Sequence, residues 1–172
     1  KLITTYSGGG TPPSTFVLKK GTGFVTNFDD VLYQYVTVDD QETPVVNGVA
    51  TWDNLEVKEG TLLTQAYTIN TTLKNQRFVI NNSGVDISTI IVKVYEQQGS
   101  TNFTTYHASD NILNLDGTSK VYFVEEIEDE NYELFFGDGI FGKKLDNGNY
   151  VEISYLITNG PSSNQSSSFS FS

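Results

Sequence analysis

The sequence contains no cysteine and no methionine, a single histidine and only three alanines among its 172 residues. The absence of cysteine excludes a disulfide scaffold, a thiol nucleophile and any Cys-ligated zinc site. Because His107 is the one imidazole, a metal site or a catalytic triad built on several histidines would need a second chain. No apolar stretch approaches the ~18 residues that a membrane-spanning helix needs, so we expect no membrane partner.

Positive charge is also scarce. The chain has 10 Lys and Arg against 21 Asp and Glu, so the formal net charge is 10 − 21 = −11. A chain this acidic repels phosphate backbones, and nucleic acid is therefore not an expected partner. No phosphate-binding loop, Gly-x-Ser-x-Gly elbow or Ser-x-x-Lys motif occurs in the sequence. We therefore expect neither enzymatic activity nor a cofactor.

The residues that are abundant favour strands. Tyr, Phe, Thr, Val and Ile are plentiful, and short apolar runs end in Gly, Asn or Asp, which is typical of strands and turns. The sequence predicts a mainly β fold, an antiparallel β-sandwich or irregular barrel, with at most one or two short helices. The only expected helix covers 108–115, capped by Ser109 or Asp110. Strands are expected over 15–20, 31–38, 49–57, 61–69, 77–80, 88–96, 102–106, 119–127, 131–136, 149–158 and 166–171.

The domain organisation predicted from composition has three parts. Residues 1–14 contain a Gly/Pro stretch from Ser7 to Pro13 that resembles a linker, 15–160 form one β domain, and 161–172 form a Ser-rich segment. The chain starts without methionine, and Ser168–Ser172 alternates like a strand interrupted in mid-course. We therefore expect a piece of a longer polypeptide, with a further domain after it.

The most distinctive stretch, residues 131–155, has two tight turns between apolar strands. Gly137-Asp138-Gly139 supplies positive-φ positions, and Asp146-Asn147-Gly148-Asn149 is typical of a hairpin. Both are interpreted as structural turns, so valine at Gly137 or Gly139 should lower the melting temperature sharply. The alternative is a calcium site with Asp138, Asp146, Asn147 and Asn149 as oxygen ligands, but their spacing matches neither an EF-hand nor a β-roll repeat.

An acid run lies just upstream, at the expected tip of a hairpin between residues 121–124 and 132–136. Its members are Glu125, Glu126, Glu128, Asp129 and Glu130, followed by Glu133 and Asp138. Two carboxylates can hydrolyse a glycosidic bond, but water would solvate this tip and nothing there would raise a pKa. The run is interpreted as a solvated turn or as a docking patch for a basic partner surface.

The aromatic residues allow a second interpretation of the whole chain. Trp52, Tyr67, Tyr95 and Tyr106 could form a sugar-stacking platform, as in carbohydrate-binding or adhesin-type β-sandwiches. Without methionine, however, most aromatic rings are needed to fill the core. Core packing is the favoured interpretation of each of these four side chains. A glycosidase is the third hypothesis for the function of the chain.

The same elements resemble a known family, the inner-ring baseplate wedge subunits of T4-type contractile phages, within the broader baseplate J-like family. The resemblance keeps its order over about 140 residues and departs after Gly160, where Pro161–Gln165 replaces a Gly-rich run. The residues that carry it are Lys20–Phe24, Val57–Thr64, Gln76–Asn81, Val85–Val94, Ser119–Glu126, Tyr132–Leu145, Gly148–Tyr155 and Thr158–Gly160.

This resemblance implies a structural part of the virion, located in the phage tail baseplate after assembly in the host cytoplasm. It implies a homo-oligomer, whose copies pair and close a ring around the central hub, and contacts with other baseplate wedge proteins. It also implies a part in relaying the rearrangement that triggers sheath contraction. The family brings no catalytic residues and no cofactor.

Overall fold

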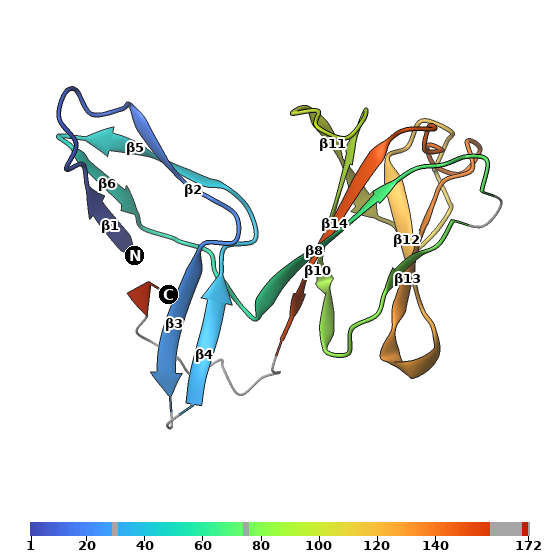
Figure 1. The fold of residues 1–172 in the computed structure, drawn as a ribbon, viewed down its shortest axis with the longest axis horizontal. Coiled ribbons are helices and arrows are strands. Elements are labelled where there is room, and N and C mark those ends of the chain that lie inside the picture. The colour runs from blue at the N-terminus through green and yellow to red at the C-terminus, as the bar shows by residue number, and fades with distance from the viewer. Residues whose placement is uncertain (29–30, 74–75, 159–169, 172) are drawn as a thin grey trace. The chain divides into compact units, whose positions relative to one another are not determined.

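The computed structural model describes residues 1–28, 31–73, 76–158 and 170–171 (Figure 1). Over these residues the fold is mainly β, and the one helix is a single 3-10 turn, η1 (Glu128–Glu130). The predicted fold class is confirmed. The described residues contain no helix that is long and apolar enough to cross a bilayer.

The chain forms two compact units, whereas the sequence analysis places one β domain over 15–160. The first unit contains Lys1–Leu62 together with Thr158–Ser172, and the second contains Leu63–Ile157. The segment expected to be a linker, 1–14, includes strand β1 (Leu2–Thr5). The residues before the Gly/Pro stretch are thus paired with β6 in a sheet.

The first unit has two four-stranded antiparallel sheets. One has the order β1, β6 (Val49–Trp52), β5 (Gln41–Val46) and β2 (Thr15–Leu18). The other has the order β15 (Ser170–Phe171), β3 (Gly23–Phe28), β4 (Val31–Val36) and β7 (Lys58–Glu59). Residues 159–169, which include most of the strand expected over 166–171, lie outside the described part.

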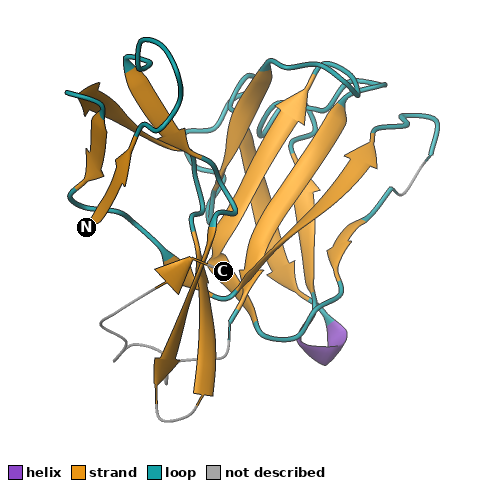
Figure 2. Ribbon diagram, turned by 60° about the vertical axis from the view of Figure 1, so that its left-hand side comes forward, coloured by secondary structure: helices purple, strands orange, loops and turns teal. Residues whose placement is uncertain are grey.

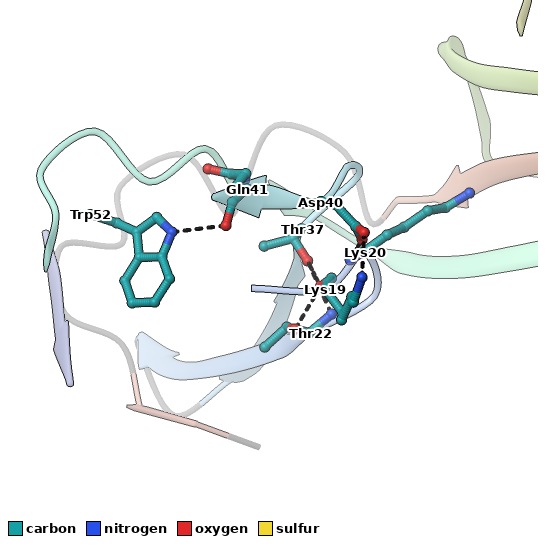
Figure 3. A network of polar contacts seen from close by, with 7 residues as sticks. All are labelled: Lys19, Lys20, Thr22, Thr37, Asp40, Gln41 and Trp52. Carbon is teal, nitrogen blue, oxygen red and sulfur yellow. Dashed lines mark hydrogen bonds and ion pairs between the residues drawn. The ribbon is translucent and has the colours of Figure 1, made fainter. Parts of the chain in front are cut away.

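A polar network holds the turn between β2 and β3, as Figure 3 shows. The Thr37 hydroxyl donates to the Lys19 carbonyl (2.7 Å), and Asp40 accepts from the Lys19 ammonium and the Lys20 amide, both at 2.8 Å. The indole of Trp52 donates to the Gln41 carbonyl (2.9 Å) and the residue is only 7% exposed. Trp52 is therefore a core residue of this unit.

The second unit is built on one seven-stranded sheet. Its order is β8 (Thr61–Thr68), β14 (Tyr150–Ile157), β10 (Val85–Tyr95), β11 (Phe103–Ala108), β12 (Val121–Glu126), β13 (Tyr132–Phe136) and β9 (Phe78–Ile80). From β14 to β9 the neighbouring strands are antiparallel, except β11 and β12, which are parallel. The parallel pair is possible because a long connection, rather than a tight hairpin, joins the two strands.

That connection, residues 109–120, is where the short helix was expected, and the prediction is wrong. The Asn111 side chain accepts from the Leu113 amide (3.1 Å), and Asn114 has a φ of 67°. Asparagine favours such local turns over helix, because its side chain competes for backbone hydrogen bonds. The apolar residues of this segment are consequently not a buried helical face, and Leu113 is 74% exposed.

The core of the second unit is formed by the inward-facing side chains of the sheet. Val92, Val151 and Ile153 are fully buried, and aromatic rings pack edge to face around them, with Phe78 and Phe136 centroids 5.1 Å apart. Tyr122 is 3% exposed and donates to the Ile90 carbonyl (3.0 Å). Aromatic rings thus fill the interior, as the absence of methionine predicts.

Burial raises the pKa of Tyr122 to about 12. A phenol in the unfolded chain ionises near pH ~10, so between that pH and about 12 the unfolded state loses a proton that the folded state keeps. The free energy of unfolding should therefore fall as pH rises through this interval. Denaturant melts of the wild type and Tyr122→Phe at pH 8 to 11.5 should show a smaller pH dependence for the variant; equal slopes would contradict this assignment.

Candidate functional site

The acid run forms the tip of the hairpin between β12 and β13, drawn with η1 in purple in Figure 2. The last paired residues are Glu126 and Tyr132, and the Ile127 amide donates to the Asn131 carbonyl (2.8 Å). All five carboxylates proposed for docking are exposed, and none forms an ion pair with another described residue. They are Glu125, Glu126, Glu128, Asp129 and Glu130.

The backbone at this tip is unusual for its residues. Asp129 and Glu130 have φ values of 60° and 57°, and the Asn131 amide donates to the Glu128 carbonyl. Two successive positive φ values are the geometry of a type I′ turn, which favours Asn-Gly. Each non-glycine residue there costs about 1 kcal/mol. The paired strands impose this turn on acidic residues, which fixes where the carboxylates project.

The opposite end of the same hairpin leads into the glycine-bracketed aspartate. One Asp138 carboxylate oxygen accepts from the backbone amides of Ile140 (2.8 Å) and Phe141 (2.9 Å). These two amides hold the pKa of Asp138 below its usual range. Of the bracketing glycines, Gly139 has a positive φ of 96° and Gly137 does not. Gly137 is needed because the backbone of Gly142 lies too close to it for a Cβ atom.

Two pairs of glycines bring backbone segments into contact here. A Cβ on Gly137 would lie 2.1 Å from the carbonyl carbon of Gly142, and a Cβ on Gly117 would lie 2.2 Å from the carbonyl oxygen of Gly139. The Gly142 amide also donates to the Asp116 carbonyl (3.0 Å). The segments 116–119 and 137–143 are therefore interlocked, and only glycine fits at both contacts.

Asp116 has a role that the sequence analysis missed. Its carboxylate accepts from the Thr118 amide (2.8 Å), the Thr118 hydroxyl (2.7 Å) and the Ser119 hydroxyl (3.1 Å). Hydrogen bonds from Thr118, more than those from Ser119, lower the pKa of Asp116. The Asp116-Gly117 dipeptide followed by Thr and Ser is a sequence signal for a turn. It lies directly after the segment expected to be a helix, 108–115.

The second predicted turn forms, but not as a hairpin. The Asn149 amide donates to the Asp146 carbonyl (3.1 Å), and Gly148 has a φ of 88°. However, the residues before Asp146 are not a strand, and β14 pairs with β8 and β10 instead. The turn is tied to a different segment, because Asn147 accepts from the Thr71 amide (3.1 Å).

Three of the four candidate calcium ligands, Asp138, Asn147 and Asn149, accept hydrogen bonds from backbone amides. Besides Asp138 and Asn147, the Asn149 side-chain oxygen accepts from the Asp146 amide (2.9 Å). Across the described ranges, no group of three or more His, Asp or Glu side chains is placed to hold a metal ion. Asp138 and Asn149 therefore accept hydrogen bonds within their own turns, and Asn147 accepts one from the segment that contains Thr71.

Glu133 belongs to the acid run by sequence but not by environment. It is 7% exposed, and its carboxylate accepts two hydrogen bonds from the Arg77 guanidinium, at 2.8 Å from Nε and 2.5 Å from Nη2. The Arg77 hydrogen bond lowers the pKa of Glu133. This pair lines a cavity of about 670 Å³, whose other lining residues include Leu73, Phe78, Phe136 and Leu145. The lining thus combines apolar side chains with a charged pair.

The four aromatic residues considered as a sugar platform do not share an exposed surface. Trp52 and Tyr106 are buried, and Trp52 belongs to the first unit. A different row crosses β11, β10 and β14, in which Tyr95 pairs with Phe103 and with Tyr150. Its rings are tilted by 54° and 59° to one another, so they do not form a flat stacking surface.

His107 lies on β11 opposite Val121 and is exposed. Its partner in the parallel pairing is thus an aliphatic residue, and its amide donates to the Lys120 carbonyl. Among the described residues, no hydrogen bond joins its imidazole to a nucleophile or to an orienting carboxylate, the arrangement that catalysis by histidine would need.

The comparisons with known proteins decide the family. Residues 65–170 match the family model described as bacteriophage baseplate wedge protein gp6, third domain. The chain belongs to this family. The match covers more than half of the 172 residues and includes the acid tip, the interlocked loops and the cavity, so the resemblance seen in the sequence is confirmed. The family is a structural component of the phage tail baseplate and hence of the virion. The search of curated proteins found no match.

Proposed function

We propose that this chain is a structural building block of the baseplate wedge that assembles with copies of itself and with other wedge proteins into the ring around the hub. In this role it helps to transmit the rearrangement that triggers sheath contraction. The family match over residues 65–170 carries the proposal. Assembly takes place in the host cytoplasm, and the chain takes part without a cofactor, a catalytic step or a nucleic acid ligand.

The two ends of the β12–β13 hairpin have different roles in this function. Gly137, Asp138 and Gly139, with Asp146, Asn147 and Gly148, are structural turns that fix the loops at one end. The tip carboxylates Glu125–Glu130 dock a basic surface of a neighbouring baseplate protein at the other end. Their exposure supports this, because a dense cluster of like charges steers association with an oppositely charged surface.

Charge reversal at the tip tests the docking role. We expect Glu126→Lys with Glu128→Lys to reduce the yield of complete baseplates at least about tenfold, equivalent to ~1.4 kcal/mol of lost association. The isolated chain should keep its melting temperature, because both side chains are exposed and have no ionic partner among the described residues. Sedimentation of assembled baseplates measures the first effect and thermal melting the second.

A matched variant controls for net charge. Glu42→Lys with Glu56→Lys changes the same number of exposed carboxylates in the first unit and should assemble like the wild type. Normal assembly of the tip variant, with the control also normal, would remove the docking role. Loss of assembly in both would indicate sensitivity to total charge rather than to the tip.

A further inference from the structure

Among the described strands, none pairs with the outer edge of β8 in the seven-stranded sheet. β8 is the first strand in the order of this sheet, and β14 is its neighbour on one side. Just beyond it, Ile69 donates to the Asn149 carbonyl and accepts from the Gly148 amide, both at 2.8 Å, on the β14 side. Because backbone groups alternate sides along a strand, those of Thr64, Ala66 and Thr68 point away from β14. The Thr68 carbonyl confirms this direction, since it accepts from the Gln76 side chain (2.9 Å).

Over residues 63–67 this edge shows, within the described part of the chain, none of the features that usually protect an edge strand. Residues 63–68, Leu-Thr-Gln-Ala-Tyr-Thr, include no charge, no proline and no glycine, although the whole chain has 10 basic and 21 acidic residues. Natural edge strands are normally protected by charge, proline, a bulge or a covering segment, because their free N–H and C=O groups pair readily with another strand. The side chains of Thr64, Ala66 and Thr68 are also exposed.

β9, the last strand in the order of this sheet, contacts β8 through side chains. The Tyr67 hydroxyl donates to the Val79 carbonyl of β9 (3.2 Å), and the Tyr67 ring packs edge to face on Phe78 (5.2 Å between centroids). In the described part of the chain, a tyrosine side chain rather than a ladder of backbone hydrogen bonds therefore joins β8 to β9 at this point. We call the line between β8 and β9, the two end strands of the sheet, the seam; the Tyr67 side chain bridges it.

We propose that the free edge of β8 pairs with one extended strand of a neighbouring polypeptide in the assembled baseplate. The chemistry of the edge selects this occupant, because a row of alternating N–H and C=O groups is satisfied by another extended backbone. The incoming segment pairs with Thr64 and Ala66 and has no proline at the residue facing Ala66. This inference rests on the proposed assembly function.

Amide hydrogen exchange tests the pairing directly. In the isolated chain, the amides of Thr64 and Ala66 should exchange rapidly, whereas those of Gln65 and Tyr67, which face β14, should be protected. In assembled baseplates the Thr64 and Ala66 amides should exchange at least tenfold more slowly, while Gln65 and Tyr67 remain protected. Mass spectrometry with fragmentation to single residues compares the two states.

A pair of variants at Ala66 supplies a second readout. Ala66→Pro removes the outward N–H and should lower incorporation into baseplates at least tenfold, whereas Ala66→Ser keeps this N–H and should incorporate normally. If the proline variant folds poorly, hydrogen exchange on the wild type decides. An Ala66 amide that exchanges equally fast in the isolated chain and in baseplates overturns the strand pairing alone. Absence of the wild-type chain from purified baseplates overturns the assembly function, and the pairing with it.

Discussion

Gly137→Ala should lower the free energy of unfolding by about 3 kcal/mol, the upper end of the range for overpacking. The added Cβ would lie 2.1 Å from the Gly142 carbonyl carbon and 2.2 Å from its oxygen. These are backbone atoms, so no side-chain rotation relieves the contact. At roughly 4–8 °C per kcal/mol for a unit of this size, a thermal melt should show a fall of more than about 10 °C.

Gly148→Ala is the matched control for this experiment. Gly148 lies in the same unit with a φ of 88°, but a Cβ there would have nothing within 4 Å. The substitution therefore carries only the cost of a left-handed backbone, about 1 kcal/mol. If the two variants melt at the same temperature, close approach of Gly137 to Gly142 is not what holds the loop, and the interlocked arrangement would be contradicted.

The strands of the second unit were largely predictable from the sequence because their apolar residues alternate. Ile90-Ile-Val-Lys-Val-Tyr95 lies within β10, and β14, Tyr150–Ile157, is one residue shorter at each end than the strand expected over 149–158. In the first unit β1, β3 and β5 were missed. β1 and β5 are short and largely exposed, and β5 contains Pro44, so composition alone argues against both.

The interlocked loops illustrate why local patterns predict a turn but not its partners. The Gly137-Asp138-Gly139 motif indicates a reversal, yet nothing in it indicates that Gly139 would contact Gly117, or that Gly142 would bond to Asp116. Likewise, the separation of Glu133 from the rest of the acid run depends on Arg77, which is 56 residues away. Contacts of this kind follow from strand order, which the sequence pattern leaves open.

Tyr155→Ala should be the most destabilising change in the core of the second unit. Tyr155 is 1% exposed, and its hydroxyl donates to Asn82 (2.7 Å) and accepts from Gln65 (3.1 Å). The side chain thus extends from β14 to β8 and to the segment after β9, on both sides of the seam. Truncation leaves a cavity and two unpaired polar groups, and we expect a loss of about 3–5 kcal/mol.

Tyr155→Phe separates packing from hydrogen bonding at this position. It keeps the ring and removes the hydroxyl, so denaturant unfolding should show a loss of only about 1 kcal/mol. Hydrogen exchange should then be faster in β8 and β9, the two strands at the seam, and unchanged in β12 and β13. A phenylalanine variant as unstable as the alanine variant would mean that the hydroxyl, rather than the ring, holds the seam closed; uniform exchange throughout the unit would contradict a local role for Tyr155.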